Sequence, residues 1–268
     1  MVEVVLTVQF AAPAVDLEVL AAFRTAVKAE LPRSEQQPLL APLVERFDVA
    51  PRTPSFEIRF DTQAGLPRSW FLSEDQRQLV QLQPDRLSLN WRRMDDSDAY
   101  PRYATLRDTF TRHLEVLRGC IRDAGRPIPG INLVELVYVN AIEFPGSSAD
   151  DDHPDLARII NRFNPGKPAG FLGQPEDAQL EARWRIPGTS LGVERPAGRL
   201  YLSATPALKA SEISPIYMVT MTGRVMPTEG NPEAAMEALD VAHEWVVLGF
   251  DDLTTPEMHR LWERHTGS

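Results

Sequence analysis

The sequence predicts an α+β fold of two similar halves, each an antiparallel sheet with helices packed on one face. Apolar and polar residues alternate over residues 2–10, a period of two that is typical of a strand. Between Leu106 and Ile121 apolar residues instead recur every three or four positions, as on one face of an amphipathic helix. After a linker rich in glycine and proline, residues 125–130, the same order of elements begins again. This order favours a duplicated β-α-β(3–4)-α unit.

The first half, residues 1–124, is predicted to run strand, helix, three or four strands, helix. Its first helix begins after Asp16, a residue type that caps helix N-termini. Residues 32–54 contain five prolines, so we expect a long connection there, with one short helix at residues 39–47. The acidic step at residues 74–76 predicts a hairpin turn. Strands are expected at residues 56–60, 69–73, 78–83 and 87–91.

The second half, residues 131–268, repeats this order. A last helix is expected after Thr254, because Thr254 and Glu257 have the spacing of a capping box and Pro256 suits a first helical turn. The halves are expected to form one compact unit, either as a pseudo-symmetric saddle or as one extended sheet. The other elements predicted in this half are strands at 132–144, 178–186, 198–205 and 213–225 and helices at 155–163 and 232–250.

The composition excludes some classes of partner. The formal net charge is −10, which disfavours non-specific contact with nucleic-acid phosphates. The single cysteine, Cys120, cannot form an internal disulfide and fits a reducing, cytoplasmic compartment. No stretch approaches the ~18 apolar residues of a membrane span. We therefore expect a soluble cytoplasmic protein that binds neither nucleic acid nor membranes.

Four segments of the chain are distinctive in combination. They read LVQLQPDRLSLNWRR at residues 79–93, YPRY at 100–103, ELVYVN at 135–140 and FDDLTTPEMH at 250–259. Together they resemble a sporadically distributed, uncharacterised family of prokaryotic proteins of about this length, and the resemblance spans nearly the whole chain. It implies a stand-alone protein of patchy occurrence, as in defence or biosynthetic clusters, and it implies no particular chemistry.

Residues 81–92 provide the main candidate for a binding surface. If Leu87, Leu89 and Trp91 face the core, the polar residues between them face the other way, together with two glutamines of the preceding strand. Such a face can bind a protein segment or a small polar ligand, with arginine gripping a carboxylate or phosphate. The alternative is the ordinary solvated side of an antiparallel sheet. The residues proposed for this face are Gln81, Gln83, Arg86, Ser88, Asn90 and Arg92.

Catalytic and metal motifs are incomplete, so the sequence favours a non-enzymatic role without metal or cofactor. His243 is followed by glutamate, as in zinc proteases, but Val247 stands where the second histidine should be. The acidic run at residues 150–152 lacks the glycine of a calcium loop. Cys120 lies two helical turns from His113, too far for direct activation as a nucleophile.

Two alternatives remain open at this point. An enzyme could assemble its pocket from residues distant in sequence, and a cleft between the halves would bring in Tyr138, Asn140 and His243 beside Arg92. These three residues are therefore added to the candidate binding residues. The protein could instead be an obligate subunit or a homodimer. Its interface would then use a strand edge and the large apolar residues near the C-terminus, which are Trp245, Phe250, Leu261 and Trp262.

Overall fold

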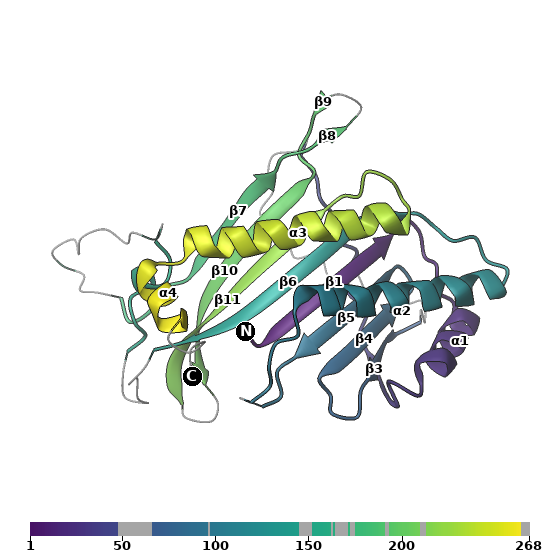
Figure 1. Cartoon of the computed structure of the whole chain (residues 1–268), viewed down its shortest axis with the longest axis horizontal. Coiled ribbons are helices and arrows are strands. Elements are labelled where there is room, and N and C mark those ends of the chain that lie inside the picture. Colours follow the sequence, from purple (N-terminus) through teal and green to yellow (C-terminus); the bar gives the residue numbers. More distant parts are fainter. Residues whose placement is uncertain are drawn as a thin grey trace.

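The computed structural model of the chain describes residues 1–47, 66–95, 97–144, 152–161, 163, 171, 175–190, 193–209 and 213–263. One large antiparallel sheet has the strand order β2-β3-β4-β5-β1-β6-β11-β10-β7 (Figure 1). The prediction of a mixed protein with a large antiparallel sheet is therefore confirmed. The strands are β1 (Glu3–Phe10), β2 (Arg33–Gln37), β3 (Arg68–Leu72), β4 (Gln78–Gln83), β5 (Arg86–Arg92), β6 (Ile131–Glu143), β7 (Leu180–Ile186), β10 (Gly198–Lys209) and β11 (Ser214–Val225), and β8 (Thr189–Ser190) and β9 (Val193–Glu194) form a separate hairpin.

β1 and β6 meet at the centre of the sheet, so strands from both halves of the chain form one continuous surface. Their register pairs Val4 with Tyr138 and Leu6 with Leu136. Outward from this seam, β5 lies beside β1 and β11 lies beside β6. The first strand of each half therefore pairs with the last strand of the same half. Of the two arrangements that the sequence left open, the extended sheet is the one observed.

The long helices α2 (Tyr103–Asp123) and α3 (Pro232–Leu253) both lie in front of the sheet in Figure 1. α2 contacts β5 and β1, whereas α3 contacts β6, β11 and β10. α1 (Leu17–Val27) packs against α2, and its N-cap is Asp16, as predicted, because the Asp16 carboxylate accepts from the Val19 N–H at 3.0 Å. The other described helical elements are α4 (Pro256–Glu263) and the 3₁₀ turn η1 (Leu156–Arg158).

Side chains alternate between the two faces of each strand, and the position of α3 identifies the apolar face. A Cβ atom on Gly223 of β11 would lie 3.0 Å from the Cβ of Ala242 of α3, so Gly223 faces this helix. The cross-strand neighbours of Gly223 in β6, β1 and β5 are Leu136, Leu6 and Leu89, and all three are fully buried. The core therefore lies on this face. The residues that alternate with Gly223, Leu136, Leu6 and Leu89 along each strand point to the opposite face.

Residues 39–47 do not form the predicted short helix. Pro42 would stand inside that helix, where a proline removes a backbone hydrogen bond and costs ~3 kcal/mol. The N–H groups of Leu40 and Leu43 instead donate to side chains of the sheet. The preceding residues form β2, which the sequence pattern missed because Arg33–Gln37 is polar throughout. Among the described strands, β2 pairs with β3 alone.

The other differences from the predicted elements are smaller. The helix expected at residues 155–163 is a 3₁₀ turn over Leu156–Arg158. The strand expected at residues 56–60 lies outside the described residues. Within the described ranges, no helix is both long enough and apolar enough to cross a bilayer.

Candidate functional site

A row of polar side chains crosses the face of the sheet that points away from Gly223. Cross-strand register places Ser88, Thr7, Glu135 and Arg224 side by side on β5, β1, β6 and β11. The hydroxyls of Thr7 and Ser88 are 2.9 Å apart, and the Arg224 Nε donates to the Glu135 carboxylate at 2.5 Å. The predicted polar face is thus present around Ser88. It also extends into the second half of the chain, beyond the residues that the sequence singled out.

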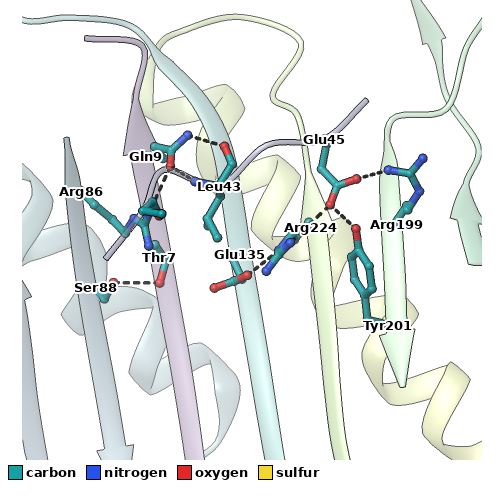
Figure 2. A network of polar contacts seen from close by, with 11 residues as sticks. Thr7, Gln9, Leu43, Glu45, Arg86, Ser88, Glu135, Arg199, Tyr201 and Arg224 are labelled. Atoms are coloured by element: carbon teal, nitrogen blue, oxygen red, sulfur yellow. Dashed lines mark hydrogen bonds and ion pairs between the residues drawn. The ribbon is translucent and has the colours of Figure 1, made fainter. Parts of the chain in front are cut away.

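Residues 38–47, which we call the strap, cross this polar face (Figure 2). The strap is held by two glutamine side chains of the sheet. The Gln9 amide donates to the Leu43 carbonyl oxygen at 2.9 Å and its oxygen accepts from the Leu43 N–H at 2.6 Å. The Gln83 amide makes the same pair of bonds with Leu40, at 3.1 and 3.3 Å. Each glutamine therefore binds the strap main chain as a neighbouring strand would.

Arg86 supports both the strap and the glutamine that binds it. Its Nη2 donates to the Ala41 carbonyl oxygen at 2.8 Å and to the Gln9 side-chain oxygen at 3.1 Å. Burial lowers the pKa of the Arg86 guanidinium. The Arg86 Nε is buried and has no hydrogen-bond partner among the described residues. The strap therefore covers a charged group that would otherwise be hydrated.

A charged clamp holds the far end of the strap. The side chain of Glu45 is completely buried and accepts from Arg199 and Tyr201, while the Arg224 Nη1 lies 3.6 Å from its carboxylate (Figure 2). Arg199 also donates to the Arg46 carbonyl oxygen at 2.6 Å. Burial raises the pKa of the Tyr201 hydroxyl, and the Glu45 charge raises it further. We call Arg199, Tyr201 and Arg224 the carboxylate clamp.

The pKa of Arg224 shows how the charges balance in this clamp. Burial alone would lower the pKa of its guanidinium, but the carboxylates of Glu135 and Glu45 outweigh that effect, and the net shift is upward. A buried cation is tolerated when acceptors surround it. The clamp is therefore suited to a carboxylate, and the strap supplies one.

Among the residues predicted for the polar face, Gln83 and Arg86 touch the strap. Gln81 instead accepts from the Trp70 indole at 3.0 Å and donates to Asn90 at 2.7 Å. Asn90 in turn donates to the Glu3 carboxylate at 2.7 Å. These groups satisfy one another and hold the strands together.

Ser88 and Arg92 are likewise occupied within the sheet. Ser88 pairs with the Thr7 hydroxyl, and Arg92 donates to the Gln76 carbonyl oxygen at 3.2 Å. The predicted polar face is real, but the strap and the sheet itself already use most of its hydrogen-bonding groups.

Tyr138 and Asn140 lie on the apolar face, not on the face of the strap, because Tyr138 pairs with Val4 and Met221 in register. Tyr138 shares a hydrogen bond of 2.9 Å with the Tyr100 hydroxyl, and burial raises its pKa. Asn140 is buried two residues further along β6. Because side chains alternate between the two faces of a strand, Tyr138 and Asn140 lie on the opposite face from Arg92 of β5, and they do not share a cleft with it.

His243 of α3 lies close to Tyr138, and the centroids of their rings are 6.0 Å apart. It stacks on Tyr103 at 3.8 Å, and burial lowers its pKa. Tyr103 donates to Asp240 at 2.9 Å, and Arg107 pairs with the same carboxylate through two bonds of 2.7 and 2.8 Å. Through these contacts, Tyr103 and Arg107 of α2 bind Asp240 and His243 of α3 and hold the two helices together.

The enzyme alternative required Arg92 to join Tyr138, Asn140 and His243 in one cleft. Arg92 follows Trp91, which faces the apolar side opposite Val4, so its own side chain leaves from the other face. Within the described ranges, no group of three or more histidines, cysteines or carboxylates is placed to hold a metal ion. The four residues do not form one site.

The large apolar residues near the C-terminus pack within the molecule. Trp245, Phe250, Leu261 and Trp262 all pack against the core, and Phe250 stacks on Trp262 with ring centroids 5.2 Å apart. Cys120 of α2 also packs against the core, and burial raises the pKa of its thiol. Trp245, Phe250, Leu261 and Trp262 are thus partly buried by the core of the chain itself.

Sequence reasoning missed Gln9, Glu45 and the carboxylate clamp. The local signal for Gln9 was present, since it occupies a polar position of an alternating strand. What was missing is the register of β1, β6, β11 and β10, which brings these distant residues to one face. Comparison of the sequence with protein-family models and with curated proteins finds no match.

Proposed function

We propose that the protein is a non-enzymatic binding protein that holds an extended polypeptide segment on the polar face of its sheet. The observation that carries this proposal is the way Gln9, Gln83 and the carboxylate clamp hold the strap. Recognition of extended peptides commonly combines main-chain hydrogen bonds, which give affinity, with side-chain pockets, which give specificity. Here the two glutamines make the main-chain hydrogen bonds, and the carboxylate clamp is the side-chain pocket.

The strap is attached in a way that permits exchange for another segment. It pairs with none of the described strands of the sheet, and most of its residues are exposed. Leu40 is 45% exposed and Val44 is 61% exposed. Segments with few buried apolar contacts open at a lower free energy than the whole fold. A competing segment can therefore occupy the same groups while the sheet stays folded.

The partner segment is defined by the chemistry of these groups. It needs an extended main chain opposite Gln83 and Gln9, and it needs a carboxylate side chain at the position of Glu45. Two arginines and a tyrosine hydroxyl around one carboxylate give charge-assisted bonds, about twice as strong as neutral ones. We therefore expect an acidic, otherwise apolar peptide segment of a partner protein or of a second copy of this chain.

The test supplies the strap as a separate peptide. A fluorescent peptide with the sequence of residues 38–47, PLLAPLVERF, is titrated with the full-length Glu45→Ala chain, whose own strap lacks the carboxylate. We expect saturable binding with a rise in anisotropy. The Glu35→Ala chain, altered at an exposed residue of β2, keeps an intact strap and should bind about tenfold more weakly, because a tethered competitor acts at an effective concentration in the millimolar range.

A second peptide, PLLAPLVQRF, tests whether the clamp reads the carboxylate. It should bind the Glu45→Ala chain at least about tenfold more weakly than the acidic peptide, since a charge-assisted contact is lost. Failure of both peptides to bind a Glu45→Ala chain with native far-ultraviolet circular dichroism would refute the proposal. If that chain does not fold, the isosteric Glu45→Gln chain is used with the same criteria.

The proposal also covers the internal duplication, the family and the cellular role of the protein. We also infer a duplicated β-α-β(3–4)-α unit with its helices on one face. In its support, each half places its first strand beside its last and continues into a long helix, and the 3₁₀ turn Leu156–Arg158 stands in the second half where the first half has α1. The four sequence segments at 79–93, 100–103, 135–140 and 250–259 support membership of the sporadic prokaryotic family. We infer a cytoplasmic accessory role in a defence or biosynthetic cluster.

A further inference from the structure

A pocket of ≈ 360 Å³ lies between the C-terminal part of α3 and the strands β10 and β7. Leu200 of β10 pairs in register with Gly223, which faces α3, so the pocket is on the apolar face and is separate from the strap. Its volume is at the lower end of the range for small-molecule sites. Its lining includes Trp184, Leu200, Glu244, Trp245, Gly249 and Asp252.

The backbone of α3 lies close to β10 at one wall of this pocket. A Cβ atom on Gly249 would lie 2.7 Å from the Leu200 Cδ2 and 3.3 Å from the Met221 Cε. A larger residue at position 249 would therefore push Leu200 into the space. The glycine both permits the close packing and leaves room beside it.

The lining of the pocket combines two indole rings with aliphatic surface. Trp184 and Trp245 are only partly buried, and Leu248, which also lines the pocket, is 60% exposed. Tryptophan binds cations over its ring face more strongly than other aromatic residues. Two partly buried indoles that line one cavity offer such a surface together with apolar contact area.

The charged groups around the pocket favour a positive ligand. Glu244 and Asp252 both line the pocket, and both residues are exposed. The arginines of β7 do not reach it from this strand, because Arg183 and Arg185 alternate with Trp184 and pair with Tyr201 and Arg199 on the face of the strap. The local charge at the pocket is thus acidic, in keeping with the net charge of −10.

We propose that this pocket binds a small organic cation with an apolar body, such as an amine or quaternary ammonium carrying an aromatic or alkyl group. The apolar body lies between Trp184, Trp245 and Leu200, and the cation lies at the Glu244 carboxylate. Acidic residues and indoles are the groups that recognise such cations. The proposal rests on different residues from the strap site and does not depend on it.

The test uses benzyltrimethylammonium as the probe and phenylacetate as an anionic counterpart, each titrated by isothermal calorimetry into the full-length chain. We expect saturable binding of the cation and at least about tenfold weaker binding of the anion. Glu244→Gln should weaken the cation about three- to tenfold. Glu237→Gln, also exposed on α3 but outside the pocket, is the matched control and should leave the affinity unchanged.

Trp184→Ala provides the independent check on the location of the probe. It should weaken the cation about tenfold or more, because it removes both the apolar wall and a ring face. If this variant loses native circular dichroism, the shift of the Trp184 indole N–H resonance on titration of the unaltered chain replaces it. Equal affinity for cation and anion, equal effects at Glu244 and Glu237, or an unmoved Trp184 resonance would each overturn the proposal.

Discussion

The side chain of Gln9 binds the main chain of Leu43 in both directions, donating to its carbonyl oxygen at 2.9 Å and accepting from its N–H at 2.6 Å. Gln9 lies on the central strand β1, and Leu43 lies in the middle of the strap. A side-chain amide carries a carbonyl acceptor and an N–H donor, the same two groups that a peptide unit offers. This pair is the anchor on which the binding proposal depends.

Replacement of Gln9 by methionine should loosen the strap. Methionine has a similar length, but it offers no comparable donor or acceptor, so Leu43 and Arg86 each lose a partner. We expect a loss of about 1–3 kcal/mol in the free energy of unfolding, measured by urea denaturation. Gln37→Met on the edge strand β2 serves as the matched control and should change little, because the Gln37 side chain makes only a 3.5 Å contact with the exposed Glu35 among the described residues.

Glu45→Gln removes the charge that the clamp surrounds. Loss of one partner of a buried charge pair typically costs about 2–5 kcal/mol. The strap, however, can detach and let Arg199 and Arg224 be hydrated, which limits the cost to the free energy that holds the strap. We therefore expect Gln9→Met and Glu45→Gln together to cost clearly less than the sum of the two single changes, in a double-mutant cycle. Strict additivity would argue against a strap that moves as one unit.

His113 predicts a loss of stability in mild acid. It is buried in α2, both ring nitrogens lack hydrogen-bond partners among the described residues, and burial lowers its pKa to about 4. Its pKa in the unfolded chain is about 6.5. The unfolded state therefore binds the proton more readily, so this contribution is complete above about pH 6.5 and is lost as the pH falls towards 4.

The size of this loss is on the order of 3 kcal/mol, because each unit of pKa difference corresponds to about 1.4 kcal/mol. Glu30, whose carboxylate is 3.7 Å from the ring, opposes the shift, whereas Arg112 adds to it. His113→Leu should clearly reduce the loss of unfolding free energy in this window, measured by urea unfolding between these pH values, and the loss that remains includes the contribution of His243, whose pKa burial also lowers. If both proteins lose stability in parallel, another group is responsible.

Gly223→Ala tests the contact between α3 and β11. The added Cβ would lie 3.0 Å from both the Cβ and the carbonyl oxygen of Ala242, so the helix must shift away from the sheet. We expect a loss of about 1–3 kcal/mol, as for other overpacked cores, seen as a lower thermal midpoint. Gly119→Ala in α2 is the control, because nothing lies within 4 Å of the added atom, and it should stabilise the chain by up to ~1 kcal/mol.

Periodicity in the sequence predicted the elements that have one polar and one apolar face. β4 and β5 lie where alternation placed them, and α2 extends the predicted stripe from Leu106 to Ile121 by a few residues at each end. The strap could not be predicted in this way. It has no period of its own, and its conformation depends on partners such as Gln9 and Arg199, which are far away in the sequence.

The site was predictable in part for the same reason. Alternation around Trp91 correctly assigned Arg86 to the polar face, and Gln83 joins it there. Alternation in β6 would have separated Tyr138 from this face had the register between β1 and β6 been known. A single sequence contains no direct signal for register between strands so far apart, which is why the two faces were confused at that point.

Native-state hydrogen exchange at the amides of Leu40 and Leu43 tests the central claim most directly. Both N–H groups donate to glutamine side chains, so the account predicts protection from exchange. It also predicts that the two amides open together, at a free energy clearly below that of global unfolding and below that of amides in β1. Exchange only through global unfolding would make the strap a permanent part of the fold. Exchange without protection would mean that the sheet does not hold the strap. Either result would contradict the account.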